Sequence, residues 1–168
     1  MNKCVFVIGP ESSGSKLIAK VCAHVLGIYE FGQWNGTGSC ESGEHKVYHR
    51  SLPYGDPPKY PDIQEWIEEN KSRYELYFIL TTRDISISEL SRHDRWSRPA
   101  ELSRQQSLKA KEIMVGVMKS GFNFFIWSYE TFIFLDKNYL DLLYRYLGVE
   151  SDFLPELIDG NRKKIIPH

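Results

Sequence analysis

Short, continuous apolar runs alternate along this chain with longer stretches in which apolar residues recur at helical spacing. Three runs are almost wholly apolar or aromatic, which is typical of strands buried on both faces: Val5–Ile8, Leu76–Thr81 and Phe122–Trp127. Lys46–Arg50 predicts a further short strand. Because helical patterns separate these segments, we predict an α/β fold with a central, mainly parallel sheet of four to five strands flanked by helices.

The helical stretches place apolar residues on one face at intervals of three or four. They predict helices over Ser15–Leu26, Asp62–Arg73, Ile85–His93, Pro99–Lys119 and Phe132–Leu147. Asp84 is placed to cap the third of these helices and Gly148 to end the last. In the longest helix, Leu108, Val115 and Met118 are expected to face the core. Residues 31–43 and 51–61 lack periodicity and are expected to be irregular.

Composition narrows the class of protein. The 168 residues are enough for one domain, spanning 1–168, and 42% of them are hydrophobic. A net charge of −1 gives no basic field, so nucleic acid is not an expected partner. No apolar run approaches the length of a membrane span, and the chain passes directly into its first strand without a leader, so we expect a cytoplasmic protein. The three cysteines lie far apart, which predicts neither a disulfide framework nor a zinc site.

The first candidate for a binding site is the segment Gly9–Lys16, GPESSGSK, between the first strand and the first helix. Backbone N–H groups of such a loop and of the first helical turn converge on one point, where the helix dipole favours an anion. Two glycines lie five positions apart as in a P-loop, but Ser15-Lys16 reverses the order of Lys and Ser/Thr in that motif. The loop therefore predicts a phosphate site other than that of ATP and magnesium. The alternative is a tight turn with Ser15 as helix N-cap.

Polar residues also follow the other predicted strands, and parallel strands bring such residues to one edge of the sheet. His49 and Arg50 lie at the end of the second strand, Arg83 follows the third and Tyr129-Glu130 the fourth. Arg83 precedes a helix, and Ser91 lies about two turns along it. A guanidinium and a hydroxyl can hold a second phosphate. The alternative for Arg83 is an ion pair with Asp84 or Glu130. The alternative for Ser91 is an ordinary serine on the surface of the helix.

These motifs together resemble those of the sulfotransferases that use 3′-phosphoadenosine 5′-phosphosulfate (PAPS). The family's first signature, PKSGTTW, is similar to Pro10–Leu17, PESSGSKL. Its second, RDPxDxxxS, is similar to the run from Arg83 to Ser91, and its YED is similar to Tyr129-Glu130. The likeness extends over Val5–Val149. It implies a three-layer P-loop-like domain that transfers a sulfuryl group to a hydroxyl or amine.

The resemblance also implies a set of site residues. It implies metal-independent binding of PAPS by Ser12, Ser13, Gly14, Ser15, Lys16, Arg83, Ser91 and Arg162. His49, within a segment similar to the family's KTHLP, is implied as the general base. Ser12 falls where the family has its catalytic lysine, and we hypothesise that Lys16 supplies that charge. The family's RKGxxGxW end is absent, and Arg162 with its basic neighbours is the hypothesised replacement.

The sequence indicates less about the acceptor molecule than about the cofactor. A small molecule or a glycan is expected to bind at the loop Ser51–Tyr60, with Tyr54, Tyr60 and Trp34 as possible stacking partners. Two other functions stay open from the sequence. One is a P-loop kinase for a small metabolite, and the other is a non-catalytic, nucleotide-binding descendant of the fold. The oligomeric state is not predicted.

Overall fold

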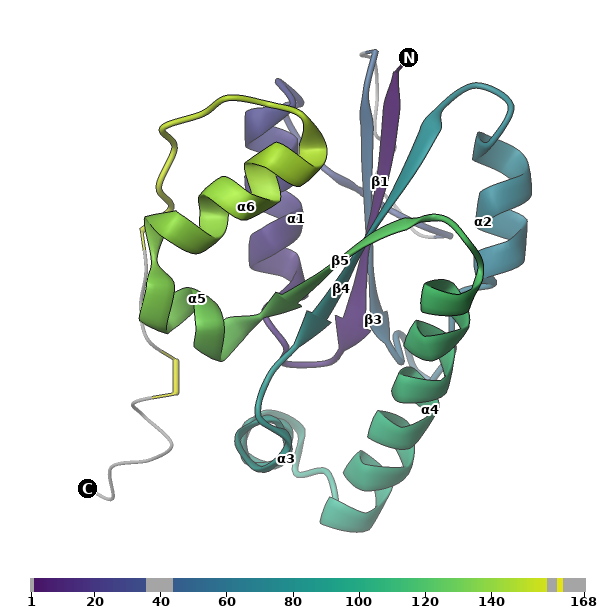
Figure 1. Ribbon diagram of the computed structural model, residues 1–168. Coiled ribbons are helices and arrows are strands. Elements are labelled where there is room, and N and C mark those ends of the chain that lie inside the picture. The colour runs from purple at the N-terminus through teal and green to yellow at the C-terminus, as the bar shows by residue number, and fades with distance from the viewer. Residues whose placement is uncertain (1, 36–43, 157–159, 162–168) are drawn as a thin grey trace.

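Five parallel strands form the centre of the computed structural model, which describes residues 2–35, 44–156, 160 and 161 (Figure 1). The strands are β1 (Lys3–Pro10), β2 (Gly32–Gln33), β3 (Lys46–Leu52), β4 (Glu75–Thr82) and β5 (Asn123–Ser128). Their order in the sheet is β2-β3-β1-β4-β5, and every pairing is parallel. This confirms the predicted α/β fold and its central sheet.

Helices cover both faces of the sheet and complete the three predicted layers (Figure 1). They are α1 (Ser15–Val25), α2 (Ile63–Asn70), α3 (Ile85–Trp96), α4 (Ala100–Lys119), α5 (Tyr129–Leu135) and α6 (Lys137–Leu147). One core cluster lies between the sheet and α1 and α6, and it contains Val5 and Val7 of β1. The other lies between the sheet and α2 and α4, and it contains Phe6 and Ile8. Alternate residues of β1 therefore face opposite layers.

Most helix boundaries follow local side-chain chemistry. Asp62 caps α2 by accepting a hydrogen bond from the N–H of Glu65, and Asp84 caps α3 by accepting one from Ile87, each at 3.0 Å. Gly148, with φ 63°, ends α6 as predicted. In the described residues, no helix is both long and apolar enough to cross a bilayer.

Several predicted boundaries are wrong, and β2 lies within residues 31–43, which were expected to be irregular. The single helix expected over Phe132–Leu147 is α5 and α6, because Asp136 adopts a left-handed φ of 52° that interrupts the helix. The strand expected to end at Arg50 continues to Leu52, so His49 and Arg50 lie inside β3 and not at its end.

The predicted core face of α4 is also wrong. Leu108 is 57% exposed and Met118 is 39% exposed, whereas Ala110 and Val117 are buried against the sheet. Ile113 and Met114 pack against the same core cluster, so the core face of α4 is rotated away from Leu108 and Met118. Leu108, Val115 and Met118 instead line a groove beside α3.

Candidate functional site

The loop between β1 and α1 has the backbone expected of an anion site. Ser12 and Gly14 adopt left-handed φ values of 67° and 83°, and such residues are typical of N–H-lined concavities. Gly14 is the N-cap of α1 and forms no side-chain cap, so Ser15 is the first helical residue and not the N-cap. The N–H groups of the first turn of α1 are thereby left for an anion.

Close packing against β4 holds this loop in place. Ser13 Oγ lies 2.6 Å from Thr81 Oγ1, and the N–H of Ser13 donates to the carbonyl of Pro10 at 3.1 Å. A Cβ added to Gly9 would lie 2.0 Å from Thr81 Oγ1, so only glycine fits there. Ser13, predicted to bind the cofactor, therefore uses both its hydroxyl and its N–H inside the protein.

Ser12 carries a loop hydroxyl whose hydrogen-bonding capacity is not used. Its Oγ is buried without a hydrogen-bond partner among the described residues. An unpaired buried hydroxyl costs about 1–3 kcal/mol, which a bound phosphate oxygen would recover. This hydroxyl and the uncapped first turn of α1 fit a phosphate group.

Arg83 lies at the same edge of the sheet and touches the loop directly. Its Nη1 donates to the carbonyl of Ser12 at 3.0 Å, and its Nε donates to Asn161 Oδ1 at 2.8 Å. The guanidinium also stacks 4.7 Å from the centre of the Tyr129 ring. The two predicted motifs, 71 residues apart, are therefore brought together.

No ion pair joins Arg83 to Asp84 or Glu130 in the part of the chain that the structure describes, although sequence allowed one. Glu130 Oε1 instead accepts hydrogen bonds from the N–H of Asp84 at 3.0 Å and from Asn161 Nδ2 at 3.2 Å. The positive charge of Arg83 is thus fixed in position without a carboxylate partner among those residues.

The remaining predicted cofactor-binding residues are Ser91, Lys16 and Arg162. Ser91 is half-buried in α3, and no hydrogen bond joins it to Arg83 within the described ranges. Lys16 is exposed in the first turn of α1. Arg162 lies outside the described residues, next to Asn161, which bonds Arg83.

His49 is buried beneath the loop and is 8% exposed. Its Nε2 lies 2.9 Å from Ser15 Oγ, and its ring packs edge-on to Phe31 at 5.7 Å between centroids. Burial, together with the positive charges of Arg50 and Lys16, lowers the pKa of His49 to about 4. His49 is therefore neutral at pH 7 and forms a buried pair with Ser15.

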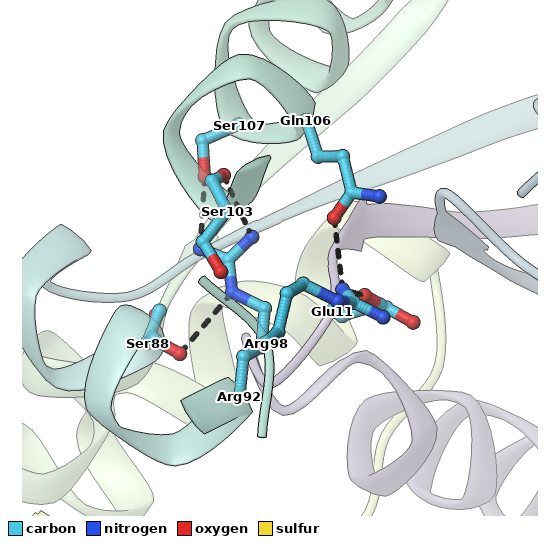
Figure 2. A network of polar contacts seen from close by, with 7 residues as sticks. All are labelled: Glu11, Ser88, Arg92, Arg98, Ser103, Gln106 and Ser107. Atoms are coloured by element: carbon cyan, nitrogen blue, oxygen red, sulfur yellow. Dashed lines mark hydrogen bonds and ion pairs between the residues drawn. The ribbon is translucent and has the colours of Figure 1, made fainter. Parts of the chain in front are cut away.

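One ion pair of the loop was not predicted from the sequence. Glu11 pairs with Arg98, between α3 and α4, and Arg98 also donates to Gln106 Oε1 at 2.9 Å (Figure 2). This contact neutralises the carboxylate beside the anion site and ties the loop to α4. The paired residues lie 87 positions apart, and no motif links them.

Trp34 and Tyr54, two of the three side chains expected to stack on an acceptor, pack against other residues of the protein. Trp34 is 6% exposed and packs edge-on to Tyr48, and its carbonyl accepts a hydrogen bond from Arg50 Nε. Tyr54 stacks under the guanidinium of Arg50 at 4.2 Å. Trp34 is therefore a core residue.

No protein-family model matches this chain, and no curated protein matches it at a significant level. The fold and the site define a class, which is a three-layer α/β protein with a parallel sheet and a glycine-bearing loop after its first strand. Within that class, the distinguishing features are Arg83 against the loop and the buried Ser15–His49 pair.

Proposed function

We propose that this protein is a sulfotransferase that moves a sulfuryl group from PAPS to a hydroxyl or amine of a small-molecule or glycan acceptor. One observation carries the proposal, namely the 3.0 Å hydrogen bond from Arg83 to the carbonyl of Ser12. This contact brings the cation of the second motif beside the loop of the first, which supports a shared phosphate-binding site. A single nucleotide with phosphates on both sides of its ribose can then contact both motifs.

PAPS, when bound, supplies the sulfuryl group. The first-turn N–H groups of α1 and the Ser12 hydroxyl bind its 5′-phosphate end, because they form the unpaired donors of the loop. Arg83 binds the 3′-phosphate, since its guanidinium is already oriented by Ser12, Asn161 and Tyr129. Lys16 contributes positive charge from the exposed side of the first turn.

Proton transfer would use the Ser15–His49 pair. The acceptor's hydroxyl or amine gives its proton to Ser15 Oγ, and Ser15 passes its own proton to His49 Nε2 at 2.9 Å. This distance is within the range for general base catalysis. With a pKa of about 4, the imidazole is neutral at pH 7, so its Nε2 can act as a base, but only as a weak one.

A non-catalytic nucleotide-binding protein is the second candidate. Two features favour it: Ser12 replaces the family's catalytic lysine, and the loop carboxylate Glu11 is held by Arg98. Such a protein would bind nucleotide at the same loop and transfer nothing.

The proposed function predicts that the protein transfers radiolabelled sulfate from PAPS to an acceptor in a panel of alcohols, phenols, amines and oligosaccharides. His49→Ala and Ser15→Ala are each expected to reduce transfer at least about 100-fold, because both remove the proton relay. Affinity for adenosine 3′,5′-bisphosphate, measured by calorimetry, should change by less than about threefold, within the range of a minor contact.

His93→Ala is the matched control, because His93 is exposed on α3 and is expected to leave transfer unchanged. Loss of bisphosphate binding together with transfer would mean that His49 only supports the loop. Binding of the bisphosphate without transfer to any acceptor would favour the non-catalytic protein.

A further inference from the structure

A groove of about 460 Å³ lies between α3, α4 and the edge of the sheet formed by β4 and β5. Its walls are mainly apolar, and the apolar side chains are Pro10, Leu80, Ile85, Leu108, Met114, Val115, Met118 and Ile126. We call it the α3–α4 groove. Its volume lies within the range of small-molecule sites. Leu108, Ile85 and Ile126 are 57%, 62% and 44% exposed, so the apolar walls are open to solvent.

The polar part of the α3–α4 groove carries charge of one sign. Arg83, Arg92, Arg104 and Lys111 line it, and none of the described lining residues is acidic. A groove that combines apolar walls with several cations is complementary to a ligand that is apolar over most of its length and anionic at one end.

Among the cations of the groove, Arg92 is the one for which an anionic partner would be most favourable. It is fully buried, and its guanidinium donates only to neutral groups: the carbonyls of Ser88 and Ser103, each at 3.2 Å, and Ser107 Oγ at 2.8 Å (Figure 2). No carboxylate lies within ion-pair distance of Arg92 in the described part of the chain. A buried cation without a counter-ion is costly, and an anion in the groove would reduce that cost.

Two acids act on Arg92 electrostatically without replacing such a ligand. The charges of Glu11 and Glu89 reach Arg92 and oppose the effect of burial, which lowers the pKa of this guanidinium. Glu11 is already paired with Arg98. Glu89 does not line the groove.

The α3–α4 groove is distinct from the proposed proton-transfer pair. His49 pairs in register with Val7, which belongs to the core cluster beside α1 and α6. Leu80, which lines the groove, belongs to the cluster on the other face of the sheet, beside α2 and α4. The groove and the His49–Ser15 pair therefore lie on opposite faces.

We infer that the α3–α4 groove binds a small acidic amphiphile, such as a medium-chain carboxylate. Its apolar body lies along Leu108, Val115 and Met118, and its anionic end lies toward Arg92. This site is additional to the proposed nucleotide site, and among the described residues Pro10 of the loop and Arg83 belong to both.

Calorimetric titration with decanoate, below its micelle-forming concentration, tests this inference. Decanoate is expected to bind at least about tenfold more tightly than decanol or decyltrimethylammonium, because only decanoate supplies an anion for the buried cation. Leu108→Glu should weaken decanoate binding at least about tenfold, since it places a negative charge in the groove that repels the carboxylate of decanoate. Arg104→Ala should also weaken binding.

Leu102→Glu is the matched control, because Leu102 is 42% exposed on the same helix but does not line the groove. It should leave decanoate binding unchanged, and circular dichroism should show that both variants are folded. Equal binding of decanoate and decanol, or an equal loss in the two glutamate variants, would overturn the inference. Affinity for adenosine 3′,5′-bisphosphate, measured on the same samples, reports separately on the proposed function and should not change with Leu108→Glu.

Discussion

Acidification from pH 6.5 to pH 4 is expected to reduce the free energy of unfolding by about 3 kcal/mol through His49 alone. Burial, with the neighbouring charges of Arg50 and Lys16, lowers the pKa of His49 from 6.5 to about 4 in the folded protein. Between these values the unfolded chain binds a proton that the folded protein does not bind. The contribution of neutral His49 is therefore fully present above pH 6.5 and is lost as the pH falls toward 4.

Urea denaturation at several pH values between 4 and 7 measures this effect. Because carboxylates also titrate in this range, the informative quantity is the difference between the wild-type protein and His49→Gln. The variant should lack the part of the pH dependence that His49 supplies, whereas His93→Gln, at an exposed position of α3, should keep it. An identical pH dependence in wild type and His49→Gln would show that the histidine does not titrate as its burial implies.

Arg83→Ala is expected to weaken binding of adenosine 3′,5′-bisphosphate by about 2–3 kcal/mol, the usual loss for a charge-assisted hydrogen bond. Binding of adenosine 5′-monophosphate should change little, because the account assigns Arg83 to the 3′-phosphate. Calorimetric titration of both ligands into wild-type and variant protein measures the two differences.

Arg95→Ala is the control for this loss of charge, because Arg95 is exposed on α3 and stacks on Trp96. It should alter neither affinity. If the wild-type protein binds the two nucleotides equally well, or if Arg83→Ala weakens both equally, Arg83 does not recognise a 3′-phosphate.

The layers and most elements could be predicted from the sequence because each depends on local patterns. The continuous apolar run of β1 requires burial on both faces, and Val5 and Phe6 do face opposite core clusters. Asp62 and Asp84 cap the helices that follow them. The break at Asp136 was missed, since its left-handed backbone has no counterpart in hydrophobic periodicity.

The site was predictable only in part. The motif spacing predicted that the loop and Arg83 share one edge, and they do. The Ser15–His49 bond was not predicted, because it depends on the register that aligns His49 with Val7. Leu108 was assigned to the core because periodicity identifies an apolar face but not what covers it.

Calorimetric titration of the unaltered protein with adenosine 3′,5′-bisphosphate, in the presence and absence of magnesium, tests the central claim most directly. A loop and an arginine that together bind two separate phosphates predict the same affinity with and without the metal. They also predict that ATP binds at least about tenfold more weakly, because it lacks the 3′-phosphate. Magnesium-dependent binding of ATP that is tighter than binding of the bisphosphate would contradict the account and identify a kinase-like site.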